Sequence, residues 1–251
     1  MHYPGSRQVQ RAYTERTLNF FDAEIISFVN SFVHRWFAVD ATFALIATNT
    51  LFSGGVIAAL IWWAWFRPST NLSVDREFLS FGVFVSALAV AVARTVAALT
   101  PYRERPIHRP ELHLRIPYMY NESTAIHWSS FPSDHSAMFC ALAVALYFVS
   151  RRAGIAALCY VFLFINLPRL YMGFHYPTDI VVGTLIGVAA GLLGRIEPLR
   201  KSATRPVLRY MEQSPGWFYA GFFIVTFQIA IIFANARHIV RYLLQLIKGG
   251  A

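Results

Sequence analysis

The fold is decided by an apolar stretch in the first third of the chain, residues 42–66, which reads TFALIATNTLFSGGVIAALIWWAWF. It contains no charged residue and ends in a cluster of aromatic side chains. A helix needs about 20 apolar residues to cross the hydrocarbon core of a bilayer, and aromatic side chains favour the bilayer interface. The stretch is therefore predicted to be a membrane-spanning helix.

Five further apolar segments predict a polytopic helical bundle. The first of them, residues 78–99, is interrupted only by Arg94 near its end. In a later one, Gly183, Gly187 and Gly191 are spaced four residues apart, which allows two helices to pack closely. We expect an all-α membrane protein with about six transmembrane helices. The other four spans, including the one with these glycines, are expected at residues 136–149, 155–167, 180–193 and 217–234.

Residues 20–36 are predicted to form an amphipathic helix that lies in the membrane interface. Apolar side chains recur there at helical spacing, but the segment also carries Asp22, Glu24, His34 and Arg35. Placing these polar groups in hydrocarbon would be costly. The chain has no tandem repeat and no low-complexity linker, so residues 1–251 are predicted to be one domain, with the motifs described below confined to residues 94–194.

The composition favours membrane lipids as partners. Only 14% of the residues are charged and 56% are hydrophobic, whereas a soluble domain has about 25% charged residues. The 22 Lys and Arg residues outnumber the 13 Asp and Glu residues, which gives a net charge of +9. This excess suits anionic headgroups or an anionic substrate. Nucleic-acid binding is disfavoured because the arginines are scattered between apolar runs.

Three polar segments at the ends of predicted spans carry the candidate chemistry. In the last of them, Pro177 suits the first turn of a helix, which places Asp179 in that turn and His175 just before it. A carboxylate there can reach one nitrogen of the imidazole and leave the lone pair of the other nitrogen free as a nucleophile. Gly173 permits a tight turn, so Arg169 is expected to point at the same place.

The other two segments supply groups that bind anions and donate protons. Ser133 is predicted to cap a helix, and the free N–H groups of that helix end attract an anion. His135, in its first turn, can donate a proton to a leaving oxygen. Arg103 and Arg105 follow the second span and can bind phosphate oxygens in pairs. The three segments together predict a phosphoryl-transfer site.

At these residues the chain resembles the type 2 phosphatidic acid phosphatase superfamily, whose motifs are Lys-x6-Arg-Pro, Pro-Ser-Gly-His and Ser-Arg-x5-His-x3-Asp. The second motif reads Pro132-Ser133-Asp134-His135 and the third reads Pro168-Arg169-x5-His175-x3-Asp179. The resemblance implies that His175 forms a phosphohistidine, that Asp179 orients His175 and that His135 is the general acid. It also implies that phosphate is bound by Arg169, Ser133 and the arginines before Pro106, without a metal or another cofactor.

The chain departs from the family pattern at three positions. No Lys precedes the Arg-Pro pair, since the matching position is Ala98, and Arg94 one turn deeper is a candidate replacement. It stays open whether Arg103 or Arg105 takes the role of the family's Arg. Pro168 replaces Ser. Asp134 replaces Gly, and the resulting Phe-Pro-Ser-Asp-His sequence is similar to bacterial undecaprenyl-diphosphatases associated with bacitracin resistance.

The expected function is hydrolysis of a polyprenyl diphosphate, such as undecaprenyl diphosphate, to the monophosphate. A phosphatase for phosphatidic acid or phosphatidylglycerol phosphate is the alternative within the same class. A transporter of anionic lipids is the alternative of another class, but binding alone needs no nucleophile. The loops after the first, third and fifth spans are rich in Arg and Lys, so this side is predicted to be cytoplasmic. The site would then face the periplasm or exterior from the plasma (inner) membrane of a bacterium.

Overall fold

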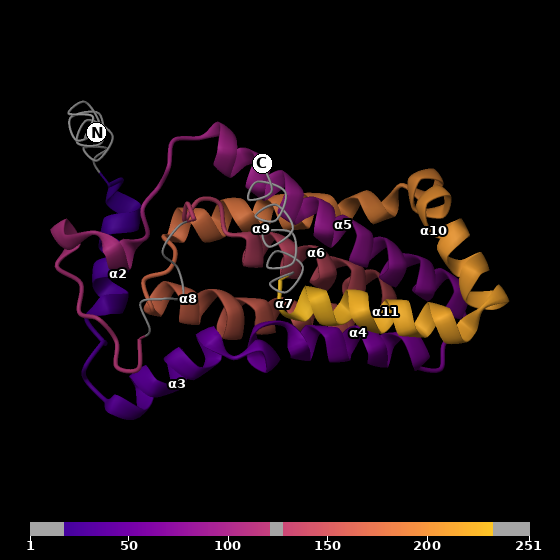
Figure 1. The fold of residues 1–251 in the computed structure, drawn as a ribbon, viewed down its shortest axis with the longest axis horizontal. Helices are drawn as coiled ribbons and strands as arrows, with labels where there is room; N and C mark the ends of the chain where they lie inside the picture. Colours follow the sequence, from indigo (N-terminus) through magenta and orange to yellow (C-terminus); the bar gives the residue numbers. More distant parts are fainter. Residues whose placement is uncertain (1–17, 121–127, 233–251) are drawn as a thin grey trace, which may run out of the picture.

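The computed structural model describes residues 18–120 and 128–232, which form helices joined by loops, with no strand among them (Figure 1). The all-α prediction is confirmed for these residues. The α-helices are α2 (Phe20–Asn30), α3 (Phe37–Thr48), α4 (Val56–Phe66), α5 (Leu72–Leu99), α6 (Asp134–Val149), α7 (Arg151–Tyr160), α8 (Leu167–Tyr171), α9 (Pro177–Leu192), α10 (Glu197–Gln213) and α11 (Pro215–Ala230). Short π-helical segments precede α4 (Leu51–Gly55) and α8 (Val161–Asn166), and 3-10 turns lie at Pro106–His108, Pro110–Leu112 and Leu193–Arg195.

Fewer helices meet the length of a membrane span than the six expected. Within the described residues, three helices are long and apolar enough, at Leu72–Leu99, Arg151–Tyr171 and Pro177–Arg195. The helices α6 and α11 have 16 residues each, which is about 24 Å at 1.5 Å per residue, whereas the hydrocarbon core is about 30 Å thick. The chain is a polytopic membrane protein, and the count of six crossings is not confirmed.

The apolar stretch at residues 42–66 is not one straight helix, as the sequence predicted, but two helices that meet at an angle of 64°. They make a fourth candidate span if both are counted together. The break lies at Asn49, whose backbone is extended and whose side-chain oxygen accepts the N–H of Leu51 at 2.9 Å. Asn side chains compete with helical hydrogen bonds in this way, so a polar residue inside the apolar run causes the bend.

The centre of the bundle is α6, which packs against α5, α7 and α9 and is buried along most of its length. Glycines on α9 allow the closest of these contacts. A β-carbon added to Gly183 would lie 2.3 Å from the carbonyl oxygen of Ser133, and one added to Gly187 would lie 2.2 Å from that of Ala137. The close helix packing predicted from the spacing of the α9 glycines is confirmed. It brings the first turns of α6 and α9 together.

The predicted N-terminal helix is shorter than expected and turns a polar residue inward. The helix α2 ends at Asn30, and a turn that includes His34 at a positive φ of 66° separates it from α3. Phe20 and Phe28 are exposed on the surface of the bundle, which fits an interfacial position. Asp22, however, is completely buried instead of lying in the polar interface.

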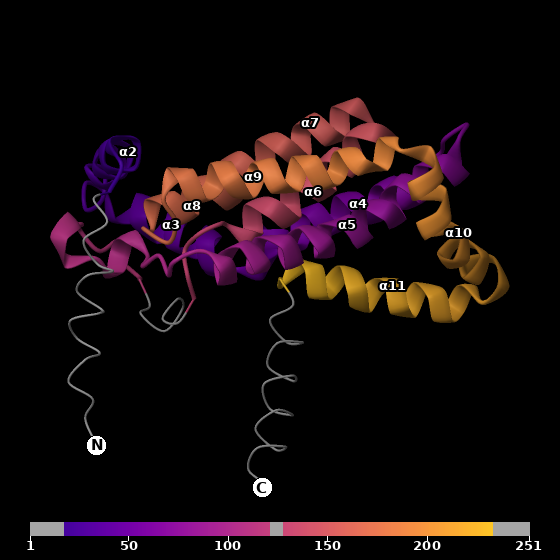
Figure 2. The same cartoon turned by 90° about the horizontal axis from the view of Figure 1, so that it is seen from above.

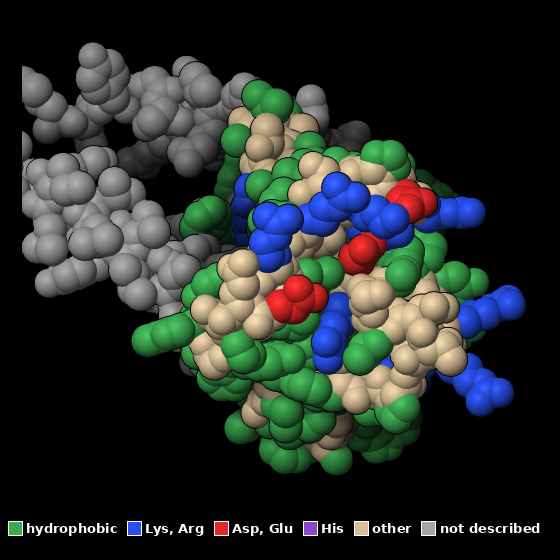
Figure 3. Space-filling model, turned by 90° about the vertical axis from the view of Figure 1, so that its right-hand side faces the viewer, with side chains coloured by type: hydrophobic (Ala, Val, Ile, Leu, Met, Phe, Trp, Pro, Cys, Tyr) green, Lys and Arg blue, Asp and Glu red, His purple; other side chains and the backbone are tan. Residues whose placement is uncertain are grey.

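The three motifs lie at the same end of the bundle, as predicted. Figures 1 and 2 show α2, α8 and the start of α9 at one end and α10 at the opposite end. Figure 3 looks at the α10 end, where Lys and Arg side chains gather on the surface. This end includes the exposed Arg205 and Arg209 of α10. The polar site and the basic surface are therefore separated by the length of the bundle.

Candidate active site

The loop between α8 and α9 places His175 at the end of the bundle. Gly173 adopts a left-handed conformation with φ of 67°, which glycine tolerates best, so the chain turns back after α8. Pro177 begins α9, and the Asp179 carboxylate accepts the N–H of Tyr176 at 2.8 Å. Both features follow the expectation from the sequence, and together they fix the segment that carries His175.

The hydrogen bonds of His175 define which ring nitrogen is free. Its Nδ1 lies 2.9 Å from the carbonyl oxygen of Ser130 and 3.6 Å from Oδ2 of Asp179. Both neighbours are acceptors, so Nδ1 must carry the proton and Nε2 keeps its lone pair. The sequence predicted the same tautomer, but with Asp179 as the only acceptor for the Nδ1 proton. The closer partner is a backbone carbonyl, and Asp179 lies beyond ordinary hydrogen-bond distance.

The environment of His175 favours the neutral ring. Burial lowers the pKa of His175 and outweighs Asp179 and Asp134, whose negative charges raise it. The positive charge of Arg105 lowers the pKa further. His175 is 3% exposed and is thus a neutral imidazole with a free nitrogen. The nearby positive charge of Arg105 would attract a phosphate group to this nitrogen.

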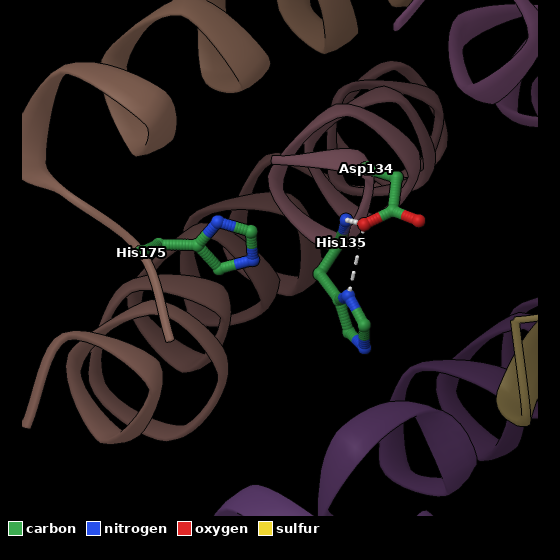
Figure 4. Close-up of side chains that lie close together, drawn as sticks. All are labelled: Asp134, His135 and His175. Atoms are coloured by element: carbon green, nitrogen blue, oxygen red, sulfur yellow. Dashed lines mark hydrogen bonds and ion pairs between the residues drawn. The ribbon is translucent and has the colours of Figure 1, made fainter. Parts of the chain in front are cut away.

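The start of α6 supplies the second histidine. Ser133 caps this helix as predicted, since its Oγ accepts the N–H of Ser136 at 3.4 Å. His135 lies in the first turn, with its Nδ1 3.3 Å from Oδ1 of Asp134. Figure 4 shows the ring of His175 pointing toward His135 and Asp134. His135 comes from the first turn of α6 and His175 from the loop before α9, and the two histidines share one site.

The same three side chains form a group that could hold a metal ion. Asp134, His135 and His175 each offer one ligand atom, and these atoms lie within 4.8 Å of one another. Two imidazoles and one carboxylate suit zinc better than magnesium or calcium, which prefer oxygen ligands. A metal there would take a nitrogen of His175, so it would compete with the use of this nitrogen as a nucleophile.

Two arginines bring positive charge to this group. Arg169, on α8, is 5% exposed and donates from Nη1 to the carbonyl oxygen of Ile165 at 3.1 Å. Arg105 donates from Nη1 to the carbonyl oxygen of Phe174 at 2.7 Å. The two guanidinium groups interact electrostatically with each other and with Asp134. Both predicted residues are therefore brought together at the site.

The other two predicted arginines are engaged with carboxylates. Arg103 lies 2.5 Å from Asp22 Oδ2 and 2.5 Å from Asp179 Oδ1. Arg94 forms an ion pair with Asp134. Arg105 is thus the arginine whose charge acts on His175 and Asp134, whereas Arg103 pairs with Asp179 and Asp22.

Sequence reasoning missed two groups, Asp22 and Ser130. Asp22 is far from the motifs in the chain and lies in a helix that was predicted to lie in the membrane interface. Ser130 contributes a carbonyl oxygen, which every residue has. Neither carried a signal in a single sequence, and only the fold reveals their contacts.

The fold and this arrangement define a helical membrane protein with a partly buried two-histidine, two-arginine site at one end of its bundle. Residues 80–197, which contain the second and third motifs and the arginines after α5, match the family described as the PAP2 superfamily. This match places residues 80–197 of the chain in the PAP2 superfamily, and the family implies a phosphatase that acts on lipid phosphates.

Known proteins with similar sequences come from bacteria. Undecaprenyl-diphosphatase BcrC of Bacillus subtilis is 23% identical over 68% of this chain and 80% of its own length. Putative undecaprenyl-diphosphatase YbjG of Escherichia coli is 26% identical over 61% of this chain and 71% of its own length. Lipid A 4'-phosphatase of Bacteroides thetaiotaomicron is 39% identical over only 25% of this chain and 28% of its own length. The crystal structure of Aquifex aeolicus LpxE aligns with 68% of this chain and 92% of that chain, at 24% identity and a TM-score of 0.46.

Proposed function

We propose that the protein hydrolyses a polyprenyl diphosphate, with undecaprenyl diphosphate as the leading candidate, to the monophosphate and inorganic phosphate. The observation that carries the proposal is the free Nε2 of His175, held in that state by the carbonyl oxygen of Ser130. A site that only binds a lipid phosphate needs positive charge but not an oriented nucleophile. The geometry thus favours an enzyme over a transporter of anionic lipids.

The reaction would proceed in two steps. In the first, the lone pair of His175 Nε2 attacks the terminal phosphorus, and the bond from this phosphorus to the bridging oxygen breaks. The polyprenyl monophosphate leaves with its electrons and takes a proton from His135. In the second, water attacks the phosphohistidine while His135 takes a proton from the water. Phosphate is released, and both histidines return to their starting states.

Charge stabilisation would come from Arg105, Arg169 and the N-terminus of α6. In phosphoryl transfer, negative charge is spread over the oxygens of the transferred group, and fixed positive groups lower the barrier. The guanidinium groups already lie near each other, although like charges repel, which is typical of a site built for an anion. Ser133 caps this helix, and the positive end of the helix dipole lies at the site beside His135. No step requires a metal.

The choice of a diphosphate rests on the Phe-Pro-Ser-Asp-His motif and on two relatives named undecaprenyl-diphosphatases. Phosphatidic acid and phosphatidylglycerol phosphate are the alternative substrates. The relative named lipid A 4'-phosphatase adds a lipid monophosphate to be tested. Purified protein should release phosphate fastest from undecaprenyl diphosphate in a panel with these lipids, and a faster rate on any other member would replace the proposed substrate.

The intermediate can be tested directly. Protein mixed with substrate labelled in the terminal phosphate should acquire a label that is lost in acid and stable in base, as expected for a phosphohistidine. His175→Ala should carry no label and less than a few per cent of the activity, while it still inserts in the membrane. His108→Ala is a control, because His108 lies in the 3-10 turn after α5 and its Nε2 bonds to the hydroxyl of Tyr120 at 3.1 Å. Retained activity in His175→Ala would refute the nucleophile.

The proposed setting is the plasma membrane of a bacterium, with one domain, six crossings and an outward-facing site. The exposed Glu111 lies in the loop at the site end, and the exposed Ser202 lies on α10 at the opposite end. In a Cys159→Ser background, Glu111→Cys should react with an impermeant maleimide in intact cells, and Ser202→Cys only after permeabilisation. The reverse pattern would invert the topology.

A further inference from the structure

The helix α2 brings a buried carboxylate to the site. Asp22 is 0% exposed, whereas Phe20 and Phe21 beside it are exposed. A carboxylate is normally excluded from such a position unless it is fully paired. The contacts of Asp22 therefore account for how α2 is held against the bundle.

Asp22 caps the helix that carries Asp179. Its Oδ1 accepts the N–H of Thr178 at 2.9 Å, and its Oδ2 accepts the hydroxyl of Thr178 at 2.6 Å. Thr178 lies in the first turn of α9, where N–H groups have no partner within the helix. Asp22, more than 150 positions from Thr178 in the sequence, thus acts as an N-cap side chain for α9. The amide of Asn19 adds a further bond to Asp22 Oδ2 at 3.0 Å.

Arg103 links Asp22 to the histidine. One terminal nitrogen of its guanidinium binds Asp22, and the other binds Asp179 Oδ1 at 2.5 Å and Thr178 Oγ1 at 2.8 Å. The guanidinium carbon also lies 4.0 Å from the centre of the Tyr176 ring. The other oxygen of Asp179 faces Nδ1 of His175. A continuous series of charged contacts therefore runs from α2 to the ring of His175.

We infer that Asp22 is a positioning residue, which holds Arg103 so that Arg103 in turn holds Asp179 beside His175. The inference rests on the proposed function, in which His175 is the nucleophile. Without Asp22, the guanidinium of Arg103 is free to form a bidentate pair with Asp179 and to draw this carboxylate away from the imidazole. The N-terminal helix is then part of the active site and not merely a membrane anchor.

Charge gives this role a signature that a packing role lacks. The charged and titratable groups facing His175 are Asp179 and Arg103 behind its ring, Arg105 after α5, and Asp134 and His135 on α6. Loss of the negative charge of Asp22 leaves the positive charge of Arg103 less compensated. An imidazolium at position 175 becomes less favourable, so the limb of the pH profile that reports His175 moves to lower pH.

The test is Asp22→Asn, which keeps an oxygen for the cap of α9 but removes the charge. We expect kcat to fall about tenfold to a hundredfold, the range seen when groups that orient an active-site ligand are removed. KM should stay within about twofold, and the acid limb of kcat/KM should shift downward. Glu24→Gln, which removes an exposed charge from the same helix, is the matched control and should behave as wild type.

Three results would overturn the inference. Wild-type kinetics in Asp22→Asn would show that the contact is not used. A lower kcat with an unchanged acid limb would indicate a structural role only. Additive losses in Asp22→Asn, Arg103→Gln and the double variant would show that the two residues act separately, whereas the inference requires the double variant to be about as impaired as Arg103→Gln.

Two further variants keep the outcome interpretable. If Asp22→Asn is not recovered from membranes, Asp22→Glu keeps the charge and should lower kcat while retaining the acid limb; a shifted limb there would contradict the role of the charge. His175→Ala, assayed in parallel, separates the two proposals. Activity retained in His175→Ala refutes the nucleophile, while activity lost there together with normal kinetics in Asp22→Asn refutes only the role of Asp22.

Discussion

Arg94 and Asp134 form an ion pair between α5 and the first residue of α6. The guanidinium of Arg94 also lies 4.8 Å from the centre of the Trp128 ring. Asp134 replaces the family's Gly, and Arg94 is the candidate replacement for the missing Lys, so the structure pairs two positions at which the chain differs from the family pattern. Asp134 adds negative charge beside a phosphate site, and Arg94 compensates it.

This pairing predicts that Arg94→Gln impairs substrate binding. The uncompensated carboxylate of Asp134 would repel the phosphate, and we expect KM to rise about tenfold, or about 1.4 kcal/mol. The double variant Arg94→Gln/Asp134→Asn should recover part of this loss. KM values of the wild type, the two single variants and the double variant measure the coupling. A double variant that is worse than Arg94→Gln would contradict the pairing and favour direct phosphate binding by Arg94.

The pH dependence of kcat/KM should be bell-shaped. His175 attacks as the neutral ring, so activity rises as pH increases through its pKa, and burial places this pKa below the ordinary 6.5. The acid limb is therefore expected below pH 6.5. Burial and Arg169 lower the pKa of His135 to about 3 in the empty site, so the acidic proton must enter with the phosphate of the substrate. A second limb at higher pH should reflect loss of that proton, and His135→Gln, which cannot pass the proton on, should remove this limb. An acid limb above pH 6.5 would contradict the assignment of the neutral form.

The role of His135 predicts a dependence on the leaving group. A lipid monophosphate expels an alkoxide, which needs a proton, whereas a diphosphate expels a phosphate, which needs little help. His135→Ala should therefore reduce kcat on the monophosphate by about tenfold more than on the diphosphate with the same lipid chain. The two substrates are compared in the same detergent. Equal losses would indicate that His135 binds phosphate and does not donate a proton.

Zinc is predicted to inhibit and not to activate. Asp134, His135 and His175 can coordinate it, and a bound ion would block the nitrogen that attacks. EDTA should leave the rate unchanged, and micromolar zinc should lower it reversibly. Asp134→Asn should weaken this inhibition because one ligand loses its charge. Loss of activity in EDTA with recovery on adding a metal would refute the metal-independent mechanism.

The contact between α6 and α9 should be sensitive to a single methyl group. Gly183→Ala would place a β-carbon 2.3 Å from the carbonyl oxygen of Ser133, so the helices must move apart. We expect a loss of about 1–3 kcal/mol in stability together with reduced activity, because His135 lies on α6 and His175 lies just before α9. Gly221→Ala is the control, since nothing lies within 4 Å of its added carbon. Equal thermal midpoints for both variants would contradict this packing argument.

The sequence predicted the elements that depend on local pattern. Hydrophobic runs indicated where most of the apolar helices lie, and glycine spacing indicated the close contact between α6 and α9. The motifs singled out His135, His175, Arg105 and Arg169, which the fold brings to one end of the bundle. Spacing also placed Pro177 and Ser133 correctly at helix starts. These features depend on residues close together in the chain, which a single sequence displays.

The remaining features depend on contacts between distant residues. The bend at Asn49 was not predicted, because the long apolar run around it favours a continuous helix whereas the side chain of Asn49 favours a break. The partners of Arg94 and Arg103 were hidden because an ion pair across helices leaves no local pattern. The aromatic cluster at the end of residues 42–66 was expected at the membrane interface, but its Trp65 is fully buried against Phe218 and Phe222 of α11. In each case the tertiary arrangement decided among several local possibilities.

The carbonyl oxygen of Ser130 has a consequence for how this protein can evolve. A substitution at position 130 changes the side chain but leaves the carbonyl oxygen in place, so no codon change there deletes the acceptor that sets the tautomer of His175. The acceptor is lost only if the backbone moves. This backbone is anchored by the N–H of Ser130, which donates to the carbonyl oxygen of Arg103 at 2.9 Å. Insertions and deletions between residues 103 and 130, more than point mutations at Ser130, are thus the changes that selection should remove.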